Sequence, residues 1–228
     1  MFSLRSAFSR LLVVGALALP AAAVLVPSDA AASVSIAVGF DMLVKDSDVV
    51  AVVTPGEQTS VWEDGRIYTY TKVRVERGVA GEIGTSADGW VRTMGGVVGK
   101  IGQLVDGEPV FVKDKASLLF MRKFKAGGVF EVSARAQGQY PITIDETTKR
   151  QKLLRSSAVG MLVPPKYTQT VTAGPPASGS VQTQSSALSD AVKVRLAQEV
   201  MHEKPLDDVA REIATAWKRL HPVEVKAK

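Results

Sequence analysis

The strongest constraint on the fold is an Asp-Gly pair between two β-prone runs in residues 60–78, which read SVWEDGRIYTYTKVRVERG. Asp64-Gly65 is a favoured dipeptide for the two-residue turn of a β-hairpin. After this turn, apolar or threonine side chains alternate with larger polar ones, which places each set on its own face of a strand. The two sets are Ile67, Thr69, Thr71, Val73 and Val75, and Tyr68, Tyr70, Lys72, Arg74 and Glu76.

Other segments of the same region also favour extended structure. We expect strands at 48–55, 89–94, 108–114, 116–123 and 129–142, and a short helical turn at 40–48. About five or six strands with few helices predict a mainly β domain at 33–145, built as a small OB-like barrel or sandwich.

The first 32 residues have the pattern of a secretory signal peptide. Two arginines precede an apolar run, and small residues follow it up to Ala32. We expect cleavage after Ala32, with cleavage after Ala23 as the second choice. The run contains Pro20 and is shorter than the ~20 residues that span a bilayer, which disfavours an uncleaved anchor. The prediction is export to the periplasm, the cell surface or the medium, with no membrane span after the signal is removed.

The chain contains no cysteine. An exported protein of this composition has no disulfide, so its fold must rest on its own apolar core. Thiolate zinc sites and cysteine nucleophiles are excluded. The formal net charge of +5 is a mild bias towards anionic surfaces, weaker than the basic pattern of a dedicated nucleic-acid binder.

The C-terminal part separates into a linker and a helical pair. Residues 146–187 are expected to be a connecting segment and flexible linker, because 164–187 are rich in Pro, Gly, Ser and Thr. Residues 188–222 predict two helices, 188–203 and 205–222, before a tail at 223–228. An apolar stripe on the second helix should dock on the barrel or the partner helix, with a dimer seam or a membrane surface as alternatives. The stripe consists of Leu206, Val209, Ile213, Trp217 and Leu220.

Residues 93–105, TMGGVVGKIGQLV, form a glycine-rich loop. Its GxxG spacing is typical of RNA-binding KH domains, but the flanking residues predict strand and turn instead of helices. A Walker loop is excluded because Ile101 stands where Ser or Thr would bind magnesium. We therefore expect the glycines to provide bends or bulges at a strand end. The loop residues of interest are Gly95, Gly96, Gly99, Gly102 and Gln103.

One strand face carries aromatic and basic side chains together. Aromatics interleaved with cations on a sheet can stack sugar rings or bases. The alternative is a mixed face partly covered by the C-terminal helices. The candidate ligand-binding residues are Tyr68, Tyr70, Lys72, Arg74, Trp90 and Arg92.

No catalytic pattern is present in the sequence. The two histidines, His202 and His221, lie at predicted helix ends, and neither HExxH nor GxSxG occurs. We expect no enzyme, no metal and no cofactor. An envelope hydrolase, whose acids would meet only in space, is the weakest alternative.

Residues 41–82 and 95–123 resemble a group of uncharacterised exported bacterial β-rich proteins. The shared features are an S-D-x-V strand, a W-x-x-G-x-I-x-T hairpin, a G-G-x-x-G-x-I-G loop and a G-E-P-x-F segment. The order of these strands is also loosely similar to netrin-like modules, the OB-barrel group that includes tissue inhibitors of metalloproteinases. Those domains begin with an inhibitory cysteine that this chain lacks, so the resemblance implies a fold and no protease inhibition.

Together these patterns predict a non-catalytic exported module of the bacterial envelope that binds or scaffolds. Its partner would be an unknown envelope protein or a glycan, and nucleic acid is disfavoured. The alternative is oligosaccharide or single-stranded nucleic-acid binding through the aromatic and basic face.

Overall fold

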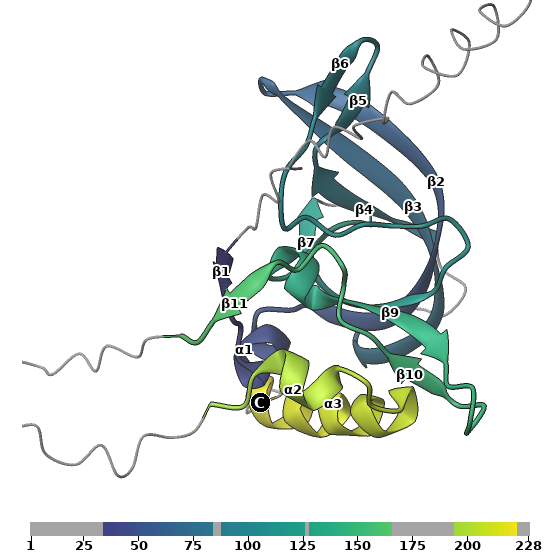
Figure 1. The fold of residues 1–228 in the computed structure, drawn as a ribbon, viewed down its shortest axis with the longest axis vertical. Helices are drawn as coiled ribbons and strands as arrows, with labels where there is room; N and C mark the ends of the chain where they lie inside the picture. The colour runs from purple at the N-terminus through teal and green to yellow at the C-terminus, as the bar shows by residue number, and fades with distance from the viewer. Residues whose placement is uncertain (1–33, 84–87, 126–127, 166–193, 223–228) are drawn as a thin grey trace, which may run out of the picture. The chain divides into compact units, whose positions relative to one another are not determined.

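Strands dominate the chain in the computed structural model, which describes residues 34–83, 88–125, 128–165 and 194–222 (Figure 1). The predicted signal peptide, the tail and most of the predicted linker lie outside these residues. The elements in chain order are β1 (Val34–Ile36), α1 (Phe40–Lys45), β2 (Val49–Glu63), β3 (Arg66–Gly81), β4 (Asp88–Met94), β5 (Gly96–Val98), β6 (Ile101–Gln103), β7 (Ser117–Lys125), β8 (Val129–Val132), the 3-10 helix η1 (Arg135–Gly138), β9 (Gln139–Ile144), β10 (Gln151–Leu153), β11 (Met161–Val163), α2 (Ala197–Met201) and α3 (Leu206–Leu220).

The hairpin of β2 and β3 is confirmed with its predicted turn. Asp64 and Gly65 have φ angles of 50° and 76°, the positive values that a type I′ turn requires. Glu63 pairs with Arg66 directly beside the turn, and pairing continues to Val49 and Gly81 with three register shifts. Such irregularities bend a strand, and β2 also pairs along its other edge with β7.

Strand β7 links parts of the main sheet that are distant in sequence. The sheet order is β10-β9-β7-β2-β3-β4-β8 among the described residues, and β7 pairs with β8 as well. Because β8 also pairs in parallel with β4, the hydrogen-bonded neighbours run from β2 through β3, β4, β8 and β7 back to β2. The sheet therefore has seven strands in the described ranges, more than the five or six expected, and five of them form a closed series of pairs.

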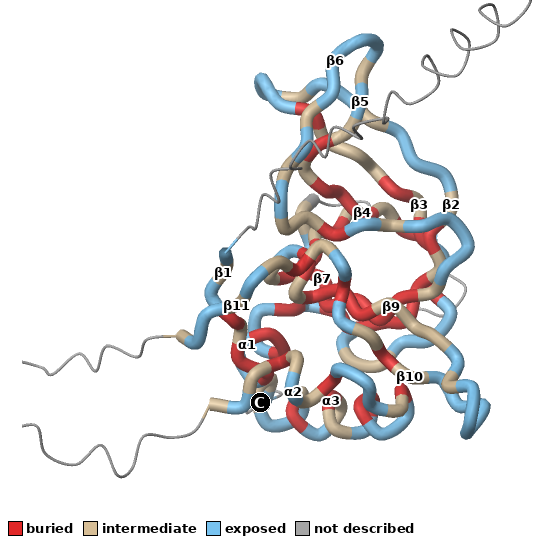
Figure 2. Tube along the Cα trace, viewed as in Figure 1, coloured by how far each residue is buried: buried red, intermediate tan, exposed pale blue. Residues whose placement is uncertain are grey.

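Two apolar clusters meet along β2 and β7. On β2, Val50 and Val52 belong to a cluster shared with α1 and α3, whereas Val49, Ala51 and Val53 belong to a second cluster shared with β3, β4 and β8. Strand β7 alternates between the same two clusters. Because both faces of these strands are buried, their sequences are apolar at every position over several residues (Figure 2).

The second C-terminal helix is confirmed, but the first is shorter than predicted. Helix α3 packs its apolar stripe into the cluster with α1 and β7, as the docking interpretation expected. Among the described residues of 188–203, residues 194–196 are not helical. The reason is a competing contact, since Leu196 forms a β-bridge with Gly39 and Phe40 N–H donates to Arg195 O at 2.9 Å.

The predicted strand at 108–114 is wrong. Side-chain amides replace a partner strand there: Gln139 Oε1 accepts from Val110 N–H at 3.1 Å and its Nε2 donates to Val110 O at 2.6 Å. Gln58 Nε2 donates to Phe111 O at 3.0 Å. Pro109 also removes one backbone donor that a ladder would use. The segment is consequently irregular, although the carbonyl groups of Val110 and Phe111 accept hydrogen bonds.

The predicted strand at 129–142 is divided into β8 and β9. Ala134 and Arg135 have φ angles of 53° and 54°, in the left-handed region, and η1 begins at Arg135. Two consecutive left-handed residues cannot continue an extended strand. The alternation of residue types in the sequence does not reveal this break.

The glycine loop builds the small hairpin of β5 and β6. Gly95, Gly96 and Gly99 have φ angles of 96°, 135° and 59°, which confirms that glycine serves the bends here. A Cβ on Gly96 would collide with the hydroxyl oxygens of Thr69 and Ser60, whereas a Cβ on Gly99 meets no atom within 4 Å.

We expect Gly96→Ala to lower the free energy of unfolding by about 2–4 kcal/mol, through the collision and the positive φ together. Gly99→Ala is the matched control and should cost only about 1 kcal/mol, because it has the backbone strain without the collision. Urea unfolding of both variants measures the difference. Equal losses would contradict the packing around Gly96.

Candidate ligand-binding face

The register between β3 and β4 brings the six predicted ligand-binding residues onto one face. Tyr70 lies directly opposite Arg92, and Lys72 lies opposite Trp90. Side chains of directly paired residues share a face, and Tyr68 and Arg74 follow at two-residue spacing along β3. We call this surface the β3–β4 face. Helix α3 contacts β3 elsewhere, where Arg77 pairs with Asp207 at 2.7 Å.

Three cations of the β3–β4 face have acidic partners. Lys72 Nζ lies 2.8 Å from Asp88, and Arg74 lies 2.8 Å from Glu76. The hydrogen bond and charge of Asp88 raise the pKa of Lys72, and the hydrogen bond from Arg74 lowers the pKa of Glu76. Exposed pairs of this kind contribute little to stability. Their main consequence is that the face offers little uncompensated positive charge.

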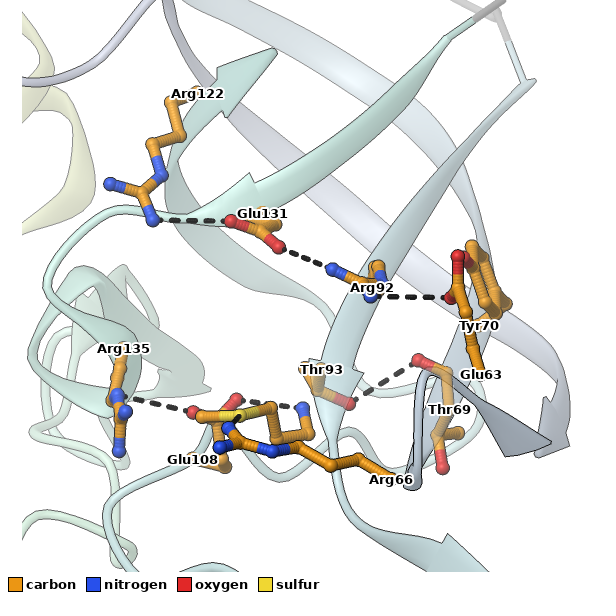
Figure 3. Close-up of polar contacts among 11 residues, drawn as sticks. Glu63, Arg66, Thr69, Tyr70, Arg92, Thr93, Glu108, Arg122, Glu131 and Arg135 are labelled. Carbon is orange, nitrogen blue, oxygen red and sulfur yellow. Dashed lines mark hydrogen bonds and ion pairs between the residues drawn. The ribbon is translucent and has the colours of Figure 1, made fainter. Parts of the chain in front are cut away.

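Arg92 is the buried centre of the face, with its side chain only 7% exposed. Its Nη1 donates to Glu131 at 2.9 Å and its Nη2 donates to Glu63 at 3.2 Å (Figure 3). Its guanidinium lies over the ring of Tyr68, 3.5 Å from the centroid, and 4.2 Å from that of Phe124. Although burial opposes its charge, the bonds to these two carboxylates raise the pKa of Arg92.

A further contact ties the aromatic side chains to this centre. Tyr70 OH donates to Glu63 at 2.9 Å, so the carboxylate that holds Arg92 also holds the phenol. Arg92 Nε is buried without a hydrogen-bond partner among the described residues. The Tyr70 ring is therefore fixed by a charge-assisted bond, and the Tyr68 ring lies against the Arg92 guanidinium.

A polar cavity of about 140 Å³ lies beside Arg92. It is formed where β3 and β4 approach β7, β8 and the irregular segment before β7. Tyr68 and Arg92 belong both to the cavity and to the β3–β4 face, so the two are continuous. The lining residues are Tyr68, Arg92, Thr93, Met94, Glu108, Pro109, Arg122, Glu131, Val132 and Arg135.

Glu108 and Arg135 form the far side of this cavity. Glu108 accepts from Met94 N–H at 3.1 Å and lies 3.3 Å from Arg135 Nε. Burial raises the pKa of Glu108. Arg135 and the preceding Ala134 are held in left-handed backbone, at a cost of order 1–3 kcal/mol per residue. This backbone places the guanidinium beside Glu108.

The glycine loop residues are used to attach β5 and β6 to β3. Gln103 Oε1 accepts from Ile67 N–H at 2.8 Å, and Gly95 O accepts from Thr69 Oγ1 at 2.7 Å. Gly96 packs against Thr69, while Gly99 and Gly102 lie in the hairpin itself. None of the five is a lining residue of the cavity. These contacts support a structural role.

Sequence reasoning did not find the acidic residues of this site. Glu63 is part of the hairpin next to the turn, and Glu108 lies in a segment that was predicted to be a strand. Glu131 and Arg122 are opposite each other in the β7–β8 register, but that pairing is absent from the sequence pattern. The alternation along each strand could have shown which face Glu131 and Arg122 occupy. It could not have shown which residues pair with them.

Comparison with protein-family models, with curated proteins and with solved structures gives no match for this chain. Within the described ranges, no group of three or more His, Cys, Asp or Glu is placed to hold a metal ion. No helix in the same ranges is long and apolar enough to cross a membrane. The candidate site therefore rests on its own geometry.

The raised pKa of Glu108 predicts a pH-dependent effect of its removal. Between the unfolded and the folded pKa, the folded chain binds more protons, so ionisation of Glu108 lowers stability as the pH rises through that window. We expect Glu108→Gln to gain free energy of unfolding relative to the wild type as the pH rises from 4 to 7. Urea unfolding at several pH values tests this.

Asp145→Asn is the control with the opposite sign. Hydrogen bonds from the backbone and side chain of Thr148 lower the pKa of Asp145 to about 2. The wild-type carboxylate therefore adds stability that is lost as the pH falls towards 2. The free energy of unfolding of the variant should consequently fall relative to that of the wild type as the pH rises from 2 to 5. The same trend for both variants would contradict the burial of Glu108.

Proposed function

We propose that this protein is a non-catalytic binding module exported to the bacterial envelope, and that its β3–β4 face binds an oligosaccharide. The observation that carries the proposal is the register of β3 and β4. It sets Tyr70 beside Arg92 and Trp90 beside Lys72 on one face. Aromatic rings flanked by fixed hydrogen-bonding groups suit sugar rings, which have an apolar side and a rim of hydroxyls.

The order of strand pairing supports an OB-like barrel. The closed series β2-β3-β4-β8-β7 contains five strands, and its one parallel pair joins β4 to β8. OB barrels are five-stranded and bind oligosaccharides or oligonucleotides on the face of their second and third strands. In this chain β3 and β4 are the second and third strands of the series, and they carry the proposed site.

The charge balance favours a glycan over a nucleic acid. Single-stranded nucleic acids bind to grooves with excess positive charge that follows the phosphates. Here Lys72, Arg74 and Arg92 are paired with acids, and Asp88 and Glu131 would face the phosphates. Sugar hydroxyls can donate to these carboxylates and accept from the cations, so the existing pairs do not oppose them.

The proposal excludes catalysis because the carboxylates of the face are held by arginine. Glu63 and Glu131 both accept from Arg92, which fixes their positions. Glu108 is a carboxyl with a raised pKa in the adjoining cavity, and it would be the acid of a hydrolase if one existed. Release of reducing sugar from any bound oligosaccharide would decide for the hydrolase.

Calorimetric titration against a panel of neutral oligosaccharides, an acidic oligogalacturonate and oligo-dT tests the binding proposal. We expect at least one oligosaccharide to bind, and Trp90→Ala to weaken it about tenfold, because the variant loses the ring contact. Oligo-dT should bind more weakly than that oligosaccharide.

Trp62→Ala is the matched control. Trp62 is 55% exposed and pairs with Ile67, so it lies on the opposite face of the hairpin from Tyr68 and Tyr70. Its removal should leave the affinity unchanged. An absence of binding to every oligosaccharide, or equal losses in the two tryptophan variants, would overturn the proposal.

A further inference from the structure

Three arginines from three different elements surround the cavity beside the β3–β4 face. Arg92 comes from β4, Arg122 from β7 and Arg135 from η1 (Figure 3). We propose that this cavity takes the carboxylate of a uronic acid, so that the ligand of the β3–β4 face is an acidic oligosaccharide. This inference rests on the proposed function and adds the chemical class of the ligand.

The charge count of the cavity leaves room for one anionic group. Its lining contains three arginines and two glutamates, an excess of one positive charge. Arg66, which donates to Met94 Sδ, and Glu63, which accepts from Arg92, adjoin the lining and add one charge of each sign. The excess is therefore unchanged, at four cations to three acids. A single carboxylate would balance it.

Arg122 and Arg135 have the donors that such a carboxylate needs. Each is about half exposed, at 52% and 55% of its side chain, and each has one ion pair among the described residues. Arg122 uses Nη2 on Glu131, and Arg135 uses Nε on Glu108. A guanidinium carries five N–H donors, so each has donors left for an incoming carboxylate.

Arg92 has a different part in the same site. It is buried, it is bonded to two carboxylates, and its guanidinium lies over the rings of Tyr68 and Phe124. It therefore acts as a positioning residue: Arg92 holds Glu131 in place. Glu131 in turn holds Arg122 through their ion pair. The ligand contacts fall to the two more exposed arginines.

The size of the cavity limits what it can hold. A volume of about 140 Å³ corresponds to about five water molecules at about 30 Å³ each, which is enough for a carboxylate and part of its ring. The rest of an oligosaccharide would extend over Tyr68 onto the β3–β4 face, where Tyr70 and Trp90 lie. A nucleic-acid strand would bring several negative charges to a site that balances one.

The left-handed backbone at Ala134 and Arg135 is a second, independent observation at this site. Backbone strain of this kind persists where the surrounding structure holds it and is concentrated at ligand sites. Here Ala136 N–H donates to Gly107 O at 2.9 Å, which fixes the turn beside the segment that carries Glu108. Arg135 is thus held at the cavity before any ligand arrives.

The test compares a neutral oligosaccharide that ends in a single galacturonate with its methyl ester, which keeps the rings but lacks the charge. We expect the acid to bind the full chain about tenfold more tightly than the ester, the effect of one charge-assisted contact. Arg122→Gln and Arg135→Gln should each remove about that factor for the acid and leave the ester unchanged. Arg122→Lys should recover part of the loss, since it restores the charge without the fork of donors.

Arg150→Gln is the matched control, because Arg150 is exposed in the turn between β9 and β10 and lines no part of the cavity. It should leave both affinities unchanged. Thermal unfolding of each variant confirms that the exposed substitutions leave the fold intact.

The remaining outcomes separate the two proposals. Equal affinity for acid and ester, or no loss in the arginine variants, would overturn the uronic acid site, and the proposed function would stand if binding still required Trp90. If inorganic phosphate binds more tightly than galacturonate, the preferred anion of the cavity is a phosphate and the uronic acid site is overturned. Failure of every oligosaccharide to bind would overturn both proposals.

Discussion

The structure depends on the double pairing of β7. Its first residues lie between β2 and β9, and its residues from Met121 onward pair with β8, so one strand closes a series of pairs and extends the sheet beyond it. The pairs between β2 and β7 join segments that are more than 60 residues apart in the chain. They also give β2 and β7 two buried faces, which explains why two separate apolar clusters can share the same strands.

The parts of the fold that follow from local chemistry could be predicted from the sequence. Asp64-Gly65 specifies its own turn, and the alternation after it assigns the faces of β3 correctly. The parts that depend on distant partners could not. Nothing local to 108–114 indicates that the amide of Gln139 will bond its backbone, and nothing local to Ala134 indicates left-handed φ. Likewise, the first C-terminal helix gives way at Leu196 to a bridge with Gly39.

The candidate site divides in the same way. Period-two spacing was sufficient to group Tyr68, Tyr70 and Lys72, because neighbours on one strand share a face without any knowledge of the fold. The partners of Arg92 lie 29 and 39 residues away, and one of them, Glu131, is on β8, whose pairing is set by closure. The sequence therefore shows that a basic residue lies on a face, but it does not show which acidic residues pair with it. That distinction favours a sugar over a polyanion as the ligand.

The cluster beneath β2 and β7 has a consequence for the chain during synthesis. Its apolar side chains on these strands are covered by α3, which contributes Leu206, Val209 and Ile213 from far downstream. A ribosome that has completed β7 still has about 95 residues to add before α3 is complete. Until then the nascent polypeptide exposes an apolar, aggregation-prone surface rich in valine and leucine. Holdase chaperones recognise surfaces of this kind.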